Sequence, residues 1–209
     1  PLRLAITPAG NLLPDSKPSG TPHHAVNNGA AWVASNDDGG QARQGVMQFT
    51  GAENDQITLN AAAGFTSTAG TISFWMRSPG ASGGGSEGAM LFDRRTGAGT
   101  VLVQKDDGTL FIQSAPSSAN SFSSTVSVSD DKWHHIAVTY DQSVSGSVSL
   151  YIDGVLNTTQ ANAAEWAWPA SQRVELGNSH DGYWKKFTGF LDDVRIYTRV
   201  LEDFEISAV

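Results

Sequence analysis

Alternation of apolar and polar side chains with a period of two residues is the feature that most constrains the fold of this chain. The segment TISFWMR (71–77) places every second residue, from Ile72 to Met76, on one face. The segments WHHIAVTYD (133–141) and SVSLYID (147–153) repeat the pattern. A period of two is the period of a β-strand that is buried on one side. The sequence therefore predicts a fold built mainly from strands.

Turn residues separate these segments. Two Asp-Gly pairs, Asp107-Gly108 and Asp153-Gly154, each lie between a pair of predicted strands. Asp-Gly tolerates the positive φ of a type I′ turn, so each pair predicts a tight antiparallel hairpin. The C-terminal segment LEDFEISAV (201–209) is predicted to form one short helix. We expect a single all-β domain over residues 1–209, a two-sheet antiparallel β-sandwich of the jelly-roll type.

Composition excludes several classes of protein. The chain has 21 acidic and 13 basic residues, a formal net charge of −8, which argues against a nucleic-acid-binding surface. It has no cysteine, which excludes disulfides, thiolate metal sites and cysteine nucleophiles. No apolar run approaches the roughly 20 residues of a membrane helix, so no membrane insertion is expected. Because the chain begins PLRL without a methionine, we expect a piece of a longer protein that carries other domains.

Six segments, in order, carry a resemblance to a known family. They are DSKPSGTPHHAVNNGAAW (15–32), GVMQFTGAENDQITL (45–59), GTISFWMRS (70–78), DDKWHHIAVTYD (130–141), VSLYIDGVLNTT (148–159) and VELGNSHDGYWKKFTGFLDDVRIYTRVLEDFEI (174–206). Together the segments resemble the laminin G-like or concanavalin A-like jelly roll, in its bacterial branch that is also similar to the pentraxins. The resemblance implies two large antiparallel sheets packed face to face, in a secreted, extracellular or periplasmic, bacterial protein.

This family includes sugar-binding modules, protein-interaction or adhesion modules, and glycoside hydrolases or lyases, and the fold alone does not choose among them. A retaining glycosidase needs two carboxylates about 5 Å apart. The related hydrolases carry them in patterns similar to E-x-D-x-x-E, which the glutamates here do not form. His134 and His135, on one strand with Tyr140, are candidates for lyase chemistry, unless that strand is purely structural. We predict a non-catalytic carbohydrate-binding module, with an adhesion module or an enzyme as the alternatives.

Two adjacent aspartates, Asp192 and Asp193, lie in the predicted last strand. Adjacent strand residues point to opposite faces, so one carboxylate is expected to face inward, where it needs a partner or a metal ion. The resemblance implies a structural calcium at this strand. The alternative is that Asp192 accepts hydrogen bonds from backbone N–H groups or pairs with Arg195 or Arg199. The predicted calcium ligands are Asp15, Gly20 and Asp192.

The loop GNSHDGYWKK (177–186) combines rings, an amide, a carboxylate and cations in one turn. Aromatic rings stack on sugar faces, and the loop RRTGAG (94–99) is expected to add guanidinium donors suited to a glycan, including an anionic one. Trp184 is predicted to be an exposed stacking platform whose removal leaves the fold intact; the alternative is that these rings close the rim of the sandwich. In pentraxins the corresponding loop holds calcium, but only Asp181 matches those acidic positions. The predicted carbohydrate-binding residues are Arg94, Arg95, Trp166, Trp168, Asn178, His180, Asp181, Tyr183, Trp184 and Lys185.

Overall fold

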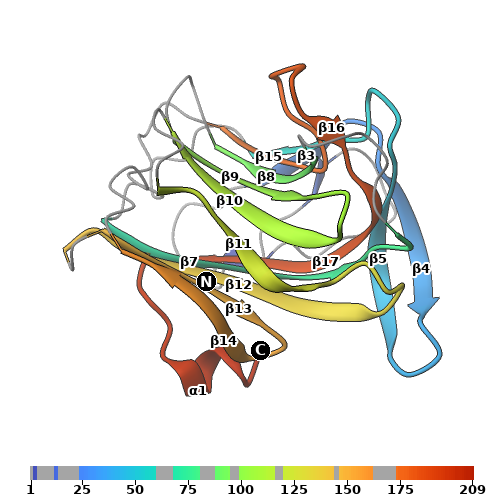
Figure 1. The fold of residues 1–209 in the computed structure, drawn as a ribbon. Helices are drawn as coiled ribbons and strands as arrows, with labels where there is room; N and C mark the ends of the chain where they lie inside the picture. Colours follow the sequence, from blue (N-terminus) through green and yellow to red (C-terminus); the bar gives the residue numbers. More distant parts are fainter. Residues whose placement is uncertain are drawn as a thin grey trace.

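The described part of the protein forms two stacked β-sheets with one short helix (Figure 1). The structure is a computed structural model, and its described strands are paired antiparallel except for one short parallel pair. The structure describes residues 2–3, 12–13, 24–59, 68–80, 88–94, 99–115, 120–143, 146–161 and 173–209.

The first sheet has eight strands in the described part of the chain. Short β1 (Leu2–Arg3) pairs with the last strand, with Leu2 opposite Ile196, so the first and last of the described strands lie side by side. The main path runs through β14 (Val155–Gln160), β13 (Ser147–Ile152), β12 (Trp133–Asp141), β7 (Ala69–Arg77), β17 (Thr188–Tyr197), β5 (Ala42–Thr50) and β4 (Ala31–Asp37).

The second sheet, as far as the structure describes it, has nine strands. Short β16 (Lys185–Lys186) pairs in parallel with β8. The main path runs through β11 (Phe122–Ser127), β10 (Thr109–Ala115), β9 (Gly99–Gln104), β8 (Ala89–Asp93), β15 (Val174–Leu176), β6 (Ile57–Leu59), β3 (Ala25–Asn27) and β2 (Leu12–Leu13). Both described paths combine hairpins with pairs of strands that are distant in sequence, such as β7 with β17 and β8 with β15, as expected for a jelly roll.

The core lies between the two sheets and is filled by the alternate side chains that the sequence pattern indicated. Phe74 and Met76 of β7 and Leu150 of β13 meet Leu102 and Leu110 from the second sheet, and each is at most 2% exposed. Burying a side chain of this size stabilises the folded state by about 1.5–3 kcal/mol. The predicted fold, an all-β antiparallel sandwich, is confirmed.

The two Asp-Gly hairpins differ in geometry. Asp153 and Gly154 have φ of 52° and 77°, so the predicted type I′ turn between β13 and β14 is confirmed. Between β9 and β10 only Gly108 has a positive φ, 79°. The backbone N–H of Gly108 donates to the carbonyl of Lys105 at 2.9 Å, which makes residues 106–108 a three-residue loop. The type I′ prediction is wrong there, because the longer loop places only its last residue in the left-handed region.

The helix α1 (Asp203–Ile206) lies on the outer face of the first sheet, below β12 and β13 in Figure 1. Ile206, which is 1% exposed, packs with Leu201 against Ala137 and Tyr151 of that face. The predicted short C-terminal helix is thus confirmed. It covers one end of the outer face.

A β-bulge explains the adjacent aspartates of β17. Asp193 has φ of 48°, and the pairing of β17 with β7 shifts between Asp192 and Arg195. The core side chains on either side, Leu191 and Val194, are therefore separated by two residues where regular alternation would leave one. Asp193 contacts Arg195 on the outer face, with Nε to Oδ1 at 3.0 Å. The expectation that one carboxylate faces inward is wrong, because the bulge turns both away from the core.

Candidate functional site

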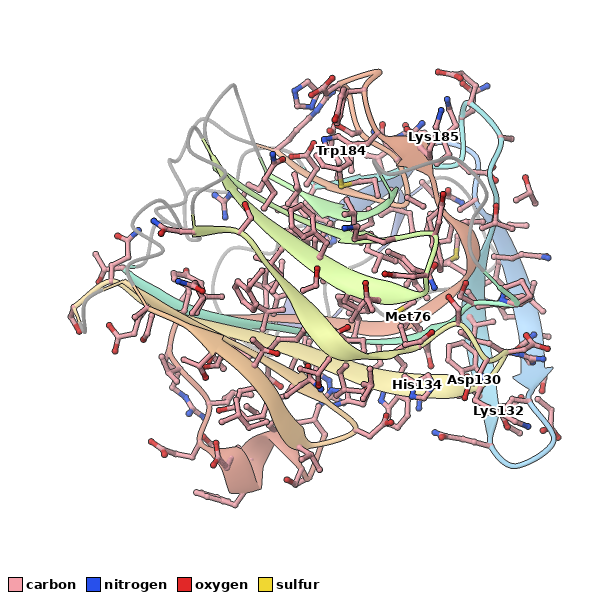
Figure 2. The ribbon with its side chains drawn as sticks, in the orientation of Figure 1. Met76, Asp130, Lys132, His134, Trp184 and Lys185 are labelled. Atoms are coloured by element: carbon pink, nitrogen blue, oxygen red, sulfur yellow. The ribbon has the colours of Figure 1, made fainter. Side chains whose placement is uncertain are left out.

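The loop of residues 177–184 folds over the outer face of the second sheet. Figure 2 places Trp184 and Lys185 above this sheet and Met76 between the two sheets. Trp184 packs against Met90, Val101 and Val103, which point outward from β8 and β9 and are fully buried. These strands are apolar on both faces, so their outer face needs a cover, and the loop supplies it.

The burial of Trp184 corrects the prediction that it is an exposed stacking platform. The residue is 5% exposed, because its ring fills the apolar hollow over β8 and β9. The neighbouring Tyr183 is 57% exposed. The two ring centroids lie 5.0 Å apart with an interplanar angle of 86°, so the edge of one ring meets the face of the other. The buried tryptophan thus supports an exposed tyrosine.

Arg94 also differs from its predicted role as a surface donor. Asp93 before it pairs with Val101 on the outer face, and Arg94, at 2% exposure, lies buried near the phenol of Tyr140. Burial lowers the pKa of the Arg94 guanidinium to about 10. This side chain is not available to a glycan. Its predicted partner Arg95 lies outside the described residues, as do Trp166 and Trp168.

Asn178, at 7% exposure, likewise has a structural role. Its Nδ2 donates to the carbonyl of Glu53 at 2.8 Å, and its Oδ1 accepts the backbone N–H of Ser179 at 2.8 Å. These bonds tie the loop to the turn before β6. The prediction that the amide contacts a sugar is therefore not supported, because both ends of the amide bond the backbone.

Four predicted sugar-binding residues remain at the surface: His180, Asp181, Tyr183 and Lys185. The Oδ1 of Asp181 accepts the backbone N–H of Tyr183 at 3.0 Å, and the Ser179 hydroxyl accepts the N–H of Asp181 at 3.0 Å. Side chain and backbone thus fix the turn that presents the tyrosine ring. His180, Asp181 and Tyr183 lie on the 177–184 loop, and Lys185 follows at the start of β16.

Sequence reasoning missed two acidic residues beneath this loop, Asp93 and Glu175. Glu175 lies directly opposite Asp93 on neighbouring strands, and the two are 1% and 0% exposed. The signal was present in the segment VELG, where Glu175 takes an outward position between buried Val174 and Leu176. Its partner could not be identified from sequence, because the pairing of β15 with β8 is long-range.

On the other sheet, Asp192 pairs with an arginine that the sequence did not suggest. Arg43 Nε lies 2.6 Å from Asp192 Oδ2, and its guanidinium lies 4.4 Å from the centre of the Trp75 ring. Burial raises the pKa of Asp192, and Arg43 opposes that shift. The alternatives that named Arg195 or Arg199 are wrong, because Arg43 on β5 reaches across the sheet.

The calcium predicted at Asp192 stays a prediction. The other predicted ligands, Asp15 and Gly20, lie outside the described residues. Asp192 Oδ2 contacts the cationic Arg43, and its Oδ1 accepts the N–H of Asp193 at 2.8 Å. Both oxygens are therefore already engaged, and a calcium ion would have to displace or share the guanidinium.

The residues considered for lyase chemistry do not converge. Tyr140 belongs to the core between the sheets, whereas His135 lies on the outer face of β12 beside Trp75. Burial lowers the pKa of His135 to about 4. His134 contacts Asp153 and Asp130 at 2.8 and 3.0 Å, and the hydrogen bond to Asp153 raises its pKa. These groups stabilise the sheet and do not share a substrate position.

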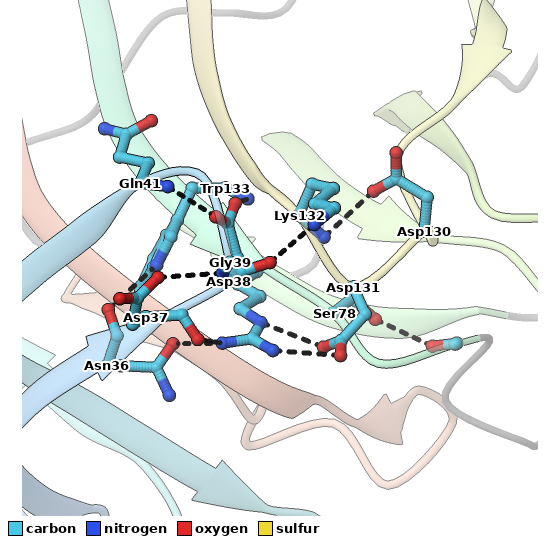
Figure 3. Close-up of polar contacts among 12 residues, drawn as sticks. Asn36, Asp37, Asp38, Gly39, Gln41, Ser78, Asp130, Asp131, Lys132 and Trp133 are labelled. Carbon is cyan, nitrogen blue, oxygen red and sulfur yellow. Dashed lines mark hydrogen bonds and ion pairs between the residues drawn. The ribbon is translucent and has the colours of Figure 1, made fainter.

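Figure 3 shows a polar network that holds the β4–β5 hairpin to the start of β12. Asp38 Oδ2 accepts the backbone N–H of Trp133 at 2.8 Å, and this bond with others lowers the pKa of Asp38 to about 2. Arg77 makes two contacts with Asp131, both at 2.9 Å, and a third with Asn36 at 2.7 Å. Each group bonds a neighbouring strand end, so the network is structural.

The family of the chain follows from the match to one family model. The model of the concanavalin A-like lectin/glucanases superfamily (Laminin_G_3) matches residues 49–207. The chain belongs to this superfamily. No curated protein matches it in sequence. Within the described residues, no helix is long and apolar enough to cross a membrane.

Solved structures with the same fold include toxin and enzyme domains. The binding domain of Paraclostridial Mosquitocidal Protein 1 superposes with a TM-score of 0.73 at 18% identity, over 99% of this chain and 50% of that one. The binding domain of Botulinum Neurotoxin DC, solved with SialylT, has a TM-score of 0.69 at 15% identity, over 99% and 49%. This chain thus spans about half the length of these toxin chains.

Domain 4 of AbnA, a GH43 extracellular arabinanase from Geobacillus stearothermophilus solved with arabinotriose, has a TM-score of 0.65 at 18% identity. The match covers 93% of this chain and 90% of that domain. At this level of identity the similarity shows a shared fold. The superfamily and these binding domains agree with the predicted laminin G-like jelly roll.

Proposed function

We propose that this domain is a non-catalytic carbohydrate-binding module of a secreted bacterial protein, and that it binds a polysaccharide at the surface of the 177–186 loop. The observation that carries the proposal is the Tyr183 ring, 57% exposed and held against the buried Trp184. An aromatic ring fixed in this way gives a sugar a stacking surface at a low cost in conformational entropy.

The polar neighbours supply the directional contacts that stacking lacks. His180 and Lys185 are exposed and Asp181 is half-buried, so amine, imidazole and carboxylate groups flank the ring. A lysine ammonium also suits the carboxylate or sulfate of an anionic glycan. The matched domain of an extracellular arabinanase was solved with arabinotriose, which supports a carbohydrate as the ligand. It also supports attachment of this domain to a larger secreted protein.

Affinity gels with a panel of neutral, carboxylated and sulfated polysaccharides test the proposal. The glycan that retards the domain most is then titrated calorimetrically into wild type and Tyr183→Ala. We expect the variant to bind 10- to 100-fold more weakly. This corresponds to the loss of about 1–3 kcal/mol that is typical of one stacked ring. Phe204→Ala is a matched control, because Phe204 is an aromatic residue 75% exposed on α1, on the other sheet. Equal affinity of wild type and Tyr183→Ala would place the site elsewhere.

The same panel separates the alternatives. Release of reducing sugar from a retarded polysaccharide would indicate an enzyme. Absence of retardation by every glycan, in a folded domain, would favour a protein-interaction or adhesion module.

A further inference from the structure

Two buried carboxylates lie side by side beneath the 177–186 loop. Asp93 on β8 and Glu175 on β15 are directly opposite each other, and both side chains point to the outer face of the sheet. Like charges at directly opposite positions destabilise a sheet. Burial at 0% and 1% exposure raises that cost, because a carboxylate removed from water needs a cation or strong hydrogen bonds. The pair therefore needs a stabilising partner.

The contacts of Glu175 leave one of its buried oxygens without an aligned donor. Arg173 Nη2 lies 2.5 Å from Glu175 Oε1, but the oxygen has no partner with hydrogen-bond geometry, so this contact is an ion pair without an aligned N–H. The Arg173 side chain is 49% exposed, and solvent screens its charge. The Ser179 hydroxyl donates to Asp93 Oδ2 at 2.5 Å and carries no charge. Glu175 Oε1 is thus buried beside a half-exposed guanidinium, without a donor aligned to it.

An imidazole completes a cluster with the geometry of a metal site. His180 Nδ1 lies 2.6 Å from Glu175 Oε2, and the backbone N–H of His180 donates to the same oxygen at 2.8 Å. Ligand atoms of Asp93, Glu175 and His180 all lie within 4.8 Å of one another. The His180 side chain is 38% exposed, which opens the cluster to solvent on one side.

The required movement is small. Bonds from Zn²⁺ to nitrogen or oxygen are about 2.0–2.2 Å long, which places two ligand atoms of a tetrahedral site roughly 3.3–3.6 Å apart. The ligand atoms of the cluster lie within 4.8 Å of one another, so their separations need to shrink by about 1.5 Å at most. Two ligands lie on hydrogen-bonded strands, which fix their backbones, and the third lies on the following loop.

We propose that Asp93, Glu175 and His180 bind a divalent transition-metal ion of the Zn²⁺ type, with water on the open side at His180. One imidazole and two carboxylates suit Zn²⁺ or Mn²⁺, whereas Ca²⁺ takes six to eight oxygen ligands and does not favour imidazole. The site is separate from the calcium predicted at Asp192, which lies on the first sheet. The test of this metal site does not depend on the proposed glycan binding, because the metal ion is titrated without a glycan.

The experiment is calorimetric titration of ZnCl₂ into metal-stripped wild-type domain, followed by the visible absorption of Co²⁺ as a probe of the same donor set. We expect one equivalent to bind and Co²⁺ to show ligand-field bands. His180→Ala should weaken binding at least tenfold and remove the bands. Because the imidazole contacts the buried Glu175, circular dichroism checks that this variant is folded. Asp93→Asn should act in the same direction, and circular dichroism checks its folding.

Glu53→Gln is the matched control, because Glu53 is a nearby carboxylate outside the cluster and its side chain is 82% exposed. It should bind Zn²⁺ as wild type does. The proposal is overturned if wild type shows no saturable Zn²⁺ binding in the micromolar range, or if His180→Ala binds as tightly as wild type. Preference for Ca²⁺ over Zn²⁺ would also overturn it.

Discussion

Replacement of Trp184 by alanine separates the structural role of the loop from its proposed binding role. The ring is 5% exposed and packs on Met90, Val101 and Val103, all of them fully buried. Its removal loses the transfer free energy of the indole and leaves a hollow over two strands whose backbones cannot collapse into it. Substitutions of this kind cost about 3–5 kcal/mol.

In a domain of this length, 1 kcal/mol corresponds to a shift of roughly 2–4 °C, so the melting temperature of Trp184→Ala should fall by about 6–20 °C. Differential scanning calorimetry measures the shift, and urea denaturation gives the free energy of unfolding independently. The matched variant is Tyr183→Ala, whose ring is 57% exposed. A surface substitution of this kind changes stability by only about 0.5 kcal/mol.

The two variants should thus show opposite patterns: Trp184→Ala loses stability, and Tyr183→Ala loses glycan affinity at nearly unchanged stability. A melting temperature of Trp184→Ala within about 2 °C of wild type would refute the packing argument, since the cavity cost would then be under about 1 kcal/mol.

Three further results are expected. Burial lowers the pKa of His135 to about 4, so protonation of this residue favours the unfolded chain. The free energy of unfolding should therefore fall by about 3 kcal/mol as the pH drops from 6.5 towards 4. Urea titrations should show a smaller fall for His135→Phe. Asp192→Asn leaves the charge of Arg43 without its partner and should lower the free energy of unfolding, measured with urea, by about 2–4 kcal/mol. If the predicted calcium binds at Asp192, CaCl₂ should raise the melting temperature of wild type more than that of this variant. Gly177→Ala should destabilise the domain by more than about 1 kcal/mol, because Gly177 has φ of +79° and an added Cβ would overlap the Phe49 ring. A melting temperature equal to that of wild type would contradict this prediction.

The sequence by itself determined the strands and their inward faces. Alternation in residues 71–77 and 147–153 is a local property of the chain, and it placed Phe74, Met76 and Leu150 in the core because a strand repeats every two residues. The Asp153-Gly154 turn was equally readable, since few residue pairs tolerate two consecutive positive φ angles.

The tertiary structure decided which of two adjacent rings is available to a ligand. Tyr183 and Trp184 are both loop aromatics in the sequence, but only Trp184 meets the apolar outer face of β8 and β9. That face is defined by strand pairings between distant segments, which no local pattern encodes. The same long-range register places Asp93 opposite Glu175 and brings His180 over both. The solvent exposure of a side chain depends on what packs above it, and the meeting of distant side chains depends on the pairing of distant strands. Both are therefore properties of the whole fold.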